Sequence, residues 1–213
     1  MPVPAEQKKR VRRDPETTRA LILYTTAKLM VEEGYAAVSS RRIAQELGLN
    51  AATIHYYYPA TDDVFIALHR RMTERQLSEL ENVLATGNPL KALWDFQSGG
   101  AQTALGVEFL ALSNHRKAIG DMIAASTNAS RAAAAEAIEQ VVGALAMGST
   151  IVPPVALATI FVAIGRLLAN EERVGIDSGH AEVRSLVEAL ISQASPHNLR
   201  LVGSPVLFVK DME

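Results

Sequence analysis

The chain has 213 residues, of which 48% are hydrophobic, so it can bury a substantial core and disorder is excluded for most of its length. It contains no cysteine, which excludes disulfides, thiolate metal sites and a cysteine nucleophile. The net charge of −2 hides a division, because residues 1–75 carry 12 Lys or Arg against 9 Asp or Glu, whereas residues 76–213 carry 9 against 14.

The first segment, residues 1–13, is a basic arm without an apolar stretch behind it, so a secretory signal is not expected. Its ordinary interpretation is a solvated, flexible tail. Beside a unit that binds nucleic acid, the same arm would contact phosphates or a minor groove. The charges are Lys8, Lys9, Arg10, Arg12 and Arg13.

Helical periodicity runs through almost the whole chain, and no segment before the C-terminal tail alternates as a strand does. Four helices are predicted up to residue 84, the first bounded by Pro15 and Gly34. They cover about 14–33, 40–47, 50–58 and 62–84. Five more follow over 89–98, 101–113, 116–147 with a loosening near 126–130, 154–175 and 181–193. The prediction is an all-α fold of about nine helices.

The longest apolar segment, residues 154–169, does not suit a membrane span. Gly165 and Arg166 interrupt it well before the ~20 residues that a bilayer requires. We therefore predict a buried core helix and a cytoplasmic protein without a membrane partner.

Residues 40–57 have the pattern of a helix-turn-helix. This motif needs a small residue where its two helices cross, which Ala44 supplies, and a turn residue that tolerates positive φ, which Gly48 supplies. Apolar residues must fill the wedge between the helices, and five stand at the required offsets. They are Ile43, Leu47, Leu49, Ile54 and Tyr57. A chance amphipathic hairpin is the alternative, but it would have to meet all seven constraints together.

In such a motif the second helix enters the major groove of DNA and the first lies on the backbone. The first turn of the second helix reaches base edges, and Ala51 and Ala52 are small enough to approach a thymine methyl group. Tyr56 suits DNA contact or core packing equally, whereas packing is favoured for Tyr57 and Tyr58. The predicted DNA-binding residues are Ser40, Arg41, Arg42, Asn50, Ala51, Ala52, Thr53, His55 and Tyr56.

These residues resemble the signature of the tetracycline-repressor (TetR) family of bacterial regulators over roughly residues 15–68. The matching pieces are Glu32-Glu33-Gly34-Tyr35, Ile43-Ala44 with Gly48-Leu49, and Thr53-Ile54-His55-Tyr56-Tyr57-Tyr58-Pro59. Three positions differ from the family pattern. Val38 replaces a capping threonine, so that Ser39 or Ser40 must cap the second helix, His55 replaces a tyrosine, and Thr61 replaces a lysine.

The resemblance implies a domain layout and a function. The ranges are a basic flexible arm at 1–13, a three-helix DNA-binding domain at 14–60, a helical effector-binding and dimerisation bundle at 61–195, and a tail at 196–213. The implied function is a repressor that leaves a palindromic operator in double-stranded DNA when a small molecule binds. The alternatives are a helical protein-interaction module and an activator without an effector.

Large, adaptable and polar residues on the middle helices are the candidates for an effector pocket. Taken singly, each large one is more often plain core, and the alternative for the polar ones is a solvated helix end. They predict a mainly apolar effector. The candidates are Trp94, Phe96, Glu108, Phe109, Asn114, His115, Met122 and Met147.

The last two predicted helices carry broad apolar faces, which the resemblance implies would pair across a two-fold axis in a homodimer. An ordinary core within one chain is the alternative, because both arrangements need the same residues. The predicted interface comprises Phe161, Gly165, Leu168, Val183, Leu186, Val187 and Leu190.

No sequence feature indicates an enzyme or a cofactor. The chain has no Gly-x-Ser-x-Gly elbow, His-Glu-x-x-His motif, phosphate loop or dinucleotide fingerprint. Its five histidines lack metal-ligand spacing, so no metal site is expected. Catalytic residues, cofactors and metals are therefore predicted to be absent.

Overall fold

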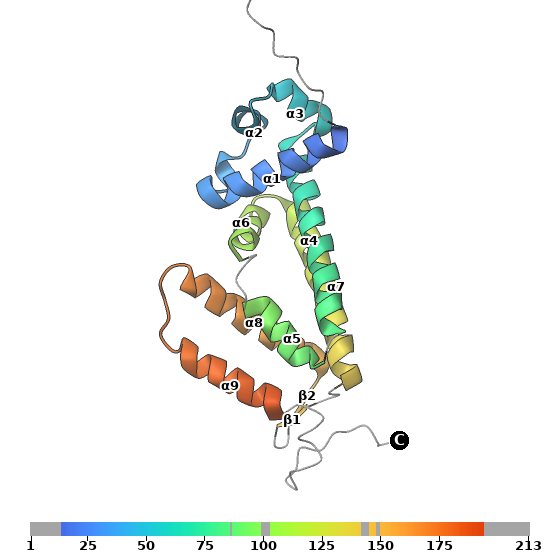
Figure 1. Cartoon of the computed structure of the whole chain (residues 1–213), viewed down its shortest axis with the longest axis vertical. Helices are drawn as coiled ribbons and strands as arrows, with labels where there is room; N and C mark the ends of the chain where they lie inside the picture. The colour runs from blue at the N-terminus through green and yellow to red at the C-terminus, as the bar shows by residue number, and fades with distance from the viewer. Residues whose placement is uncertain (1–13, 86, 99–102, 142–144, 148–149, 194–213) are drawn as a thin grey trace, which may run out of the picture. The chain divides into compact units, whose positions relative to one another are not determined.

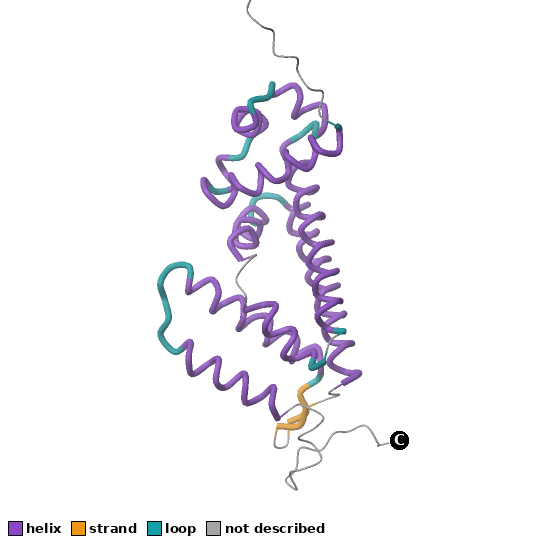
Figure 2. The backbone as a smooth tube through the Cα atoms, in the orientation of Figure 1, coloured by secondary structure: helices purple, strands orange, loops and turns teal. Residues whose placement is uncertain are grey.

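The computed structural model describes residues 14–85, 87–98, 103–141, 145–147 and 150–193. The predicted basic arm and the C-terminal tail lie outside these residues. The described part contains nine α-helices, one short 3-10 helix and one two-stranded hairpin, so the all-α prediction is confirmed (Figure 2). The chain divides into two compact units, Met1–Leu68 and His69–Glu213. The four domain ranges given above remain predictions.

Three helices of unit 1 begin at a residue whose side chain caps them. Asp14, Ser39 and Asn50 each accept a hydrogen bond from a backbone N–H of the following helix, at 3.0 to 3.1 Å. Ser39 is therefore the residue that replaces the usual threonine cap. The elements are α1 (Pro15–Glu33), η1 (Tyr35–Ala37), α2 (Ser40–Leu47), α3 (Ala51–Tyr57) and the first turns of α4 (Thr61–Leu84).

The core of unit 1 joins all of these helices. Six aliphatic side chains have no exposed surface, and burying each one contributes roughly 1.5–3 kcal/mol. They are Ile22, Leu29, Met30, Ile43, Ile54 and Val64. Because Ile43 and Ile54 lie on α2 and α3, the core fixes both helices of the motif against α1 and α4.

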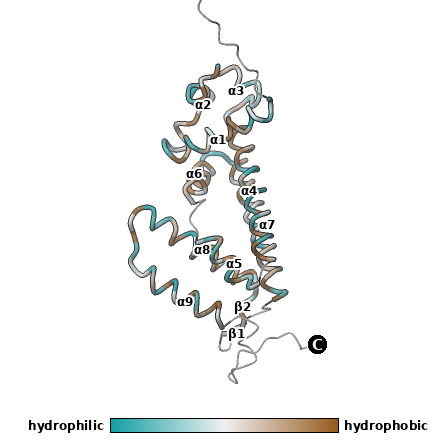
Figure 3. The backbone as a smooth tube through the Cα atoms, in the orientation of Figure 1, coloured by the Kyte–Doolittle hydropathy of each residue, from teal (hydrophilic) through white to brown (hydrophobic). Residues whose placement is uncertain are grey.

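Unit 2 begins at His69, within α4, and contains the helices that follow. In chain order these are the rest of α4, α5 (Pro89–Ser98), α6 (Thr103–Ser113), α7 (Lys117–Val141), α8 (Pro154–Glu172) and α9 (His180–Gln193) (Figure 1). Its core cluster includes Trp94, which packs edge-to-face on Phe161 at 6.4 Å between ring centroids. Helices α4, α7 and α9 carry both hydrophilic and hydrophobic residues, whereas α6 is mainly apolar (Figure 3).

The prediction of one helix over residues 116–147 was wrong in two respects. First, α7 ends at Val141, and Leu145–Met147 (β1) pairs antiparallel with Thr150–Val152 (β2). Between the strands the sequence reads Gly148-Ser149, a pair typical of two-residue hairpin connections. Second, α7 is continuous through residues 126–130, where the Ser126 and Ser130 hydroxyls donate to carbonyls three and four residues earlier.

Helix α8 is the helix of the described residues that is long and apolar enough to cross a membrane. One face of it lies in the core of unit 2, as a core helix requires. The buried residues are Leu157, Ala158, Phe161, Gly165, Leu168 and Ala169. This burial agrees with the prediction of a core helix.

The predicted dimer interface needs correction at four of its seven residues, because Phe161, Gly165, Leu168 and Val187 are buried inside the chain. Gly165 allows a close approach within one molecule, since a Cβ there would lie 2.9 Å from Cβ of Gln97 on α5. Val183 packs beside the same core, Leu190 is half-buried, and Leu186 is 61% exposed.

Candidate nucleic-acid interface and ligand cavity

The outer face of α3 carries a short stripe of exposed residues. Ala52, His55 and Tyr56 stand at positions i, i+3 and i+4, and Tyr56 is 81% exposed. Ile54 and Tyr58 are buried on the other side of the helix. Packing therefore holds one face of α3 and leaves the other free to meet a partner.

Two further groups set the geometry of this surface. Gly48 has φ +63° and ψ +33°, the left-handed conformation predicted for the turn, and it allows the Leu49 N–H to reach the Ala44 carbonyl at 2.8 Å. His55 donates from Nδ1 to the Pro59 carbonyl at 3.1 Å, because a carbonyl can only accept. This bond leaves Nε2 of His55 as the ring nitrogen available to a ligand.

The cations of α2 differ in their surroundings. Arg42 donates to Glu33 and, at 3.0 Å, to Glu46, while Lys28 bonds Glu46 at 2.8 Å, so this ion-pair network joins α1 to α2. The hydrogen bonds lower the pKa of both carboxyls and raise the pKa of Arg42 and Lys28. Arg41 is exposed and, within residues 14–68, has no acidic partner.

The remaining predicted DNA-binding residues take different places. Ser40 is buried, with its hydroxyl away from the surface, which contradicts the predicted contact. Asn50 is exposed and caps α3 through Oδ1, while Ala51 and Thr53 are half-buried in the first turn. Tyr57 is half-buried beneath the Arg19 guanidinium, which lies 5.7 Å from its ring centre.

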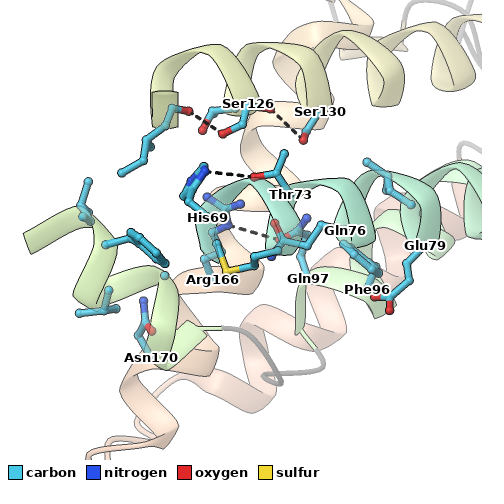
Figure 4. A pocket seen from close by; sticks show the side chains of 18 residues that line it. His69, Thr73, Gln76, Glu79, Phe96, Gln97, Ser126, Ser130, Arg166 and Asn170 are labelled. Carbon is cyan, nitrogen blue, oxygen red and sulfur yellow. Dashed lines mark hydrogen bonds between the residues drawn. The ribbon is translucent and has the colours of Figure 1, made fainter. Parts of the chain in front are cut away.

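Unit 2 contains a cavity of about 370 Å³, lined by side chains of five helices (Figure 4). Helix α4 contributes His69, Met72, Thr73, Gln76, Glu79 and Leu80. Residues of α5, α6, α7 and α8 complete the wall, namely Phe96, Gln97, Gly106, Val107, Phe109, Leu110, Ile123, Ser126, Thr127, Ser130, Arg166 and Asn170. Its volume lies in the range of small-molecule sites, roughly 300–1,000 Å³.

Two of the eight predicted effector residues, Phe96 and Phe109, line this cavity. Trp94 is buried in the core cluster instead. Met147 belongs to β1, and its side chain lies outside the described residues. The other four do not line the cavity, although they lie on α6, α7 or the turn between them. They are Glu108, Asn114, His115 and Met122.

Sequence reasoning missed the polar wall of the cavity, although its spacing is visible in the chain. Ser126 and Ser130 are four residues apart on α7, and Arg166 and Asn170 are four residues apart on α8. Polar residues at i and i+4 on the inner face of a helix indicate a hollow or a partner rather than a packed core.

Two groups of the wall are electrostatically unusual. Burial lowers the pKa of His69, which lies edge-to-face on Phe109 and is within 3.3 Å of the Thr73 hydroxyl at Nδ1. Burial also lowers the pKa of Arg166, and the charge of Arg131 adds to that effect. In Figure 4 the guanidinium of Arg166 points to Gln97, whose oxygen accepts from Nε at 3.4 Å.

Comparison with known families identifies the N-terminal part. Residues 22–68 match the model of the family described as bacterial regulatory proteins, tetR family. The chain carries a TetR-family N-terminal domain. This match confirms the family recognised from the sequence. The matched residues include α3 and its exposed face. The sequence matches none of the curated proteins.

Solved structures extend the TetR likeness to the fold of both units. A transcriptional regulator from Saccharomonospora viridis, in complex with choline, superposes with a TM-score of 0.69 at 22% identity, covering 83% of this chain and 96% of its own. A TetR regulator from Haloarcula marismortui has a TM-score of 0.63 at 19% identity, with coverages of 85% and 98%. Salmonella enterica GusR has a TM-score of 0.65 at 17% identity, with coverages of 86% and 96%. The chain has the fold of a TetR-family transcriptional regulator.

Proposed function

We propose that the protein is a homodimeric repressor that binds a palindromic DNA operator and leaves it when a small molecule enters the cavity of unit 2. The observation that carries the DNA-binding part is the exposed stripe of Ala52, His55 and Tyr56 on a helix whose other face is buried. In a helix-turn-helix of this family, that face of the second helix is the one that reads base edges.

The proposed contacts follow from exposure and charge. Asn50, Ala51, Ala52 and Thr53 meet bases at the start of α3, with His55 and Tyr56 beyond them, and Arg41 neutralises a phosphate. Ser40 is left out because it is buried. Arg42 acts on DNA indirectly, because its charge is held by two carboxylates and its role is to orient α2 against α1.

A palindromic operator requires a two-fold dimer, and the outer faces of α8 and α9 suit one. Ile160, Ala163 and Leu167 form an exposed stripe at i, i+3 and i+7 on α8. On α9, Leu186 and Ala189 are exposed at positions i and i+3. Together they offer the apolar surface that a second copy of the chain would cover.

Response to a small molecule is supported by the cavity and by α4. This helix is continuous from Thr61 to Leu84 and supplies buried Val64 and Phe65 to unit 1 as well as six cavity residues to unit 2. A ligand that favours one position of α4 would therefore bias the helix-turn-helix, through differential affinity for the two states. A neighbour of the same fold is described in complex with the small molecule choline.

The test is selection of bound fragments from the source genome with the purified chain at two salt concentrations. We expect one palindromic motif, with retention that falls steeply as salt rises. Ala52→Glu should abolish the enrichment, whereas Ala132→Glu, the same change on an exposed residue of α7, should not. If no motif is enriched and the retention of DNA fragments is the same at both salt concentrations, the DNA-binding proposal fails.

Two alternatives predict different results. A helical protein-interaction module would show no steep salt dependence on DNA. An activator would bind the same motif but lower transcription of the neighbouring gene when deleted. The proposed regulator acts in the cytoplasm, needs no cofactor and has no enzymatic activity, in keeping with the regulators that it resembles.

A further inference from the structure

Two arginines without a carboxylate partner lie at the cavity, one in its wall and one beside it. Arg166 lines the cavity, and Arg131 lines a small adjoining hollow of about 20 Å³ that shares Gln97 and Ser130 with it. Within the described residues neither arginine forms an ion pair with a carboxylate. Nε of Arg131 is buried without an acceptor, and the hydrogen bond from Arg166 to Gln97 is long at 3.4 Å.

Two positive charges in this arrangement repel each other. A guanidinium remains protonated in proteins, so two like charges lie near each other in a partly desolvated place. The lowered pKa of Arg166 has these two causes, burial first and the charge of Arg131 second. An anion placed between them would remove both penalties and could accept bidentate hydrogen bonds.

The other titratable groups of the wall do not supply that anion. Glu79 accepts from Nε of Arg75 at 2.6 Å, so its charge is already paired. His69 is buried, and its lowered pKa favours the neutral form. At the end of α8, Glu171 and Glu172 accept from His180 and Arg184 instead.

The rest of the wall suits an apolar body. Met72, Phe109, Leu110 and Ile123 line the cavity from three helices, and the ring of Phe109 lies edge-to-face on that of His69. Asn170 carries a buried Oδ1 without a donor, which a hydroxyl group or a bridging water can satisfy. The cavity thus combines an apolar body site with a cationic end.

We propose that the cavity binds a small organic carboxylate, with its apolar body against Phe109 and its carboxylate held by Arg166 and Arg131. This sharpens the proposed function, on which it rests for the role of the ligand as effector. It replaces the expectation of a mainly apolar effector by one of an amphipathic anion.

Matched probes test the charge requirement directly. Octanoate, octanamide and octylamine share one chain and differ in the head group, and phenylacetate with phenylacetamide repeats the comparison on an aromatic body. In titration calorimetry of the full chain we expect at least one carboxylate to bind ten-fold or more tightly than its amide, and the amine not to bind. Equal binding of acid and amide, or no binding by either carboxylate, overturns the proposal.

Variants assign the preference to the cavity. Arg166→Gln should reduce the acid-to-amide ratio to about one, while Arg173→Gln, an exposed arginine just beyond α8, should preserve it. Equal loss in both variants would contradict a specific site.

A measurement without ligand guards against a fold defect. Arg166 is an exposed side chain whose one hydrogen bond is long, so Arg166→Met should not lower the unfolding midpoint reported by Trp94 fluorescence. Arg173→Met should leave the midpoint unchanged. A midpoint lowered by Arg166→Met means that the arginine is structural, and overturns the proposal.

The two proposals fail separately. If the chain enriches a palindromic motif but no carboxylate binds, the ligand inference falls and the DNA-binding function stands. If octanoate or phenylacetate binds through Arg166 but no DNA motif is enriched, the DNA-binding function falls and the ligand site stands.

Discussion

The two compact units differ in how completely their polar groups are hydrogen-bonded or ion-paired. In unit 1 the three helices α1, α2 and α3 begin with a capping side chain, and Arg42 and Lys28 are ion-paired. Among the described residues, four buried side-chain nitrogen or oxygen atoms have no hydrogen-bond partner, one of them in unit 1 and three in unit 2. The first is Oγ of Ser40, and the others belong to Arg131, Asn170 and His180.

The difference indicates where each unit meets its partner. Within residues 14–68 of unit 1, Oγ of Ser40 is the one buried side-chain polar atom without a partner, so the exposed face of α3 is the surface that this unit offers to a partner. Unit 2 leaves Oδ1 of Asn170 unsatisfied in the cavity wall and Nε of Arg131 unsatisfied in the adjoining hollow, and a ligand there could bond to both. Spectroscopy can follow the units separately, because all five tyrosines lie between residues 24 and 58 and the single tryptophan is Trp94.

The largest expected effect tests whether the core of unit 2 is independent of the surface proposed for dimerisation. Phe161→Ala should cost about 3–5 kcal/mol of unfolding free energy, because it removes a ring that is 2% exposed and packed on Trp94. Denaturant titration followed by tryptophan fluorescence measures it. Ile160→Ala, on the exposed face of the same helix, should change stability little but weaken the dimer in analytical ultracentrifugation. Equal stability losses would mean that both faces are core.

A smaller effect tests the turn of unit 1. Gly48→Ala should destabilise unit 1 by roughly 1 kcal/mol, since an L-residue pays for the left-handed conformation while its Cβ would meet no atom within 4 Å. Near-ultraviolet circular dichroism of the tyrosines reports the change. Gly106→Ala, in the helix α6 and with equally open space, should have the opposite sign. A neutral Gly48→Ala would refute the conformational argument.

The next prediction separates two neighbouring arginines. Arg41→Gln should reduce the slope of log affinity against log salt by about one, the signature of one lost phosphate contact. Arg42→Gln should leave that slope nearly unchanged and reduce the stability of unit 1, because it breaks the pairs with Glu33 and Glu46. Fluorescence anisotropy of labelled operator over a salt series measures both. A lower slope in Arg42→Gln alone would reverse the assignment.

The smallest expected effect is the loss of stability of the two units as the pH falls. The lowered pKa of His69 means that the unfolded chain binds a proton more readily, so unit 2 loses stability as pH falls below the ordinary value of 6.5. Unit 1 gains from the lowered pKa of Glu33 and Glu46, a contribution that is complete above 4.5 and lost as pH falls below it. Between pH 6.5 and 4.5 the stability reported by tryptophan fluorescence should therefore fall before the stability reported by the tyrosines.

Histidine variants provide the control for that order. His69→Gln should flatten the acid response of unit 2, whereas His115→Gln, at an exposed turn, should not. Denaturation midpoints at three pH values would decide it. A tyrosine signal that fails before the tryptophan signal would contradict the comparison.

For unit 1, the sequence by itself determined the motif. The bounds of α2, the positive φ of Gly48 and the buried Ile43, Ala44 and Ile54 all agree with the pattern. These features depend on neighbours within about twenty residues, and caps and turns obey local rules. What the pattern could not determine was which of Ser39 and Ser40 caps the helix and that Arg42 is held by Glu33 of another helix.

For unit 2, only the tertiary structure decided the site. The cavity joins residues from His69 to Arg166 on five helices, and no local pattern predicts which of them converge. Helix α8 is apolar on two faces, so the sequence alone could not say that Phe161 and Gly165 turn inward while Ile160 and Leu167 turn outward. Burial is a property of packed pairs, such as Gly165 against Gln97, and a pair exists only once the chain has folded.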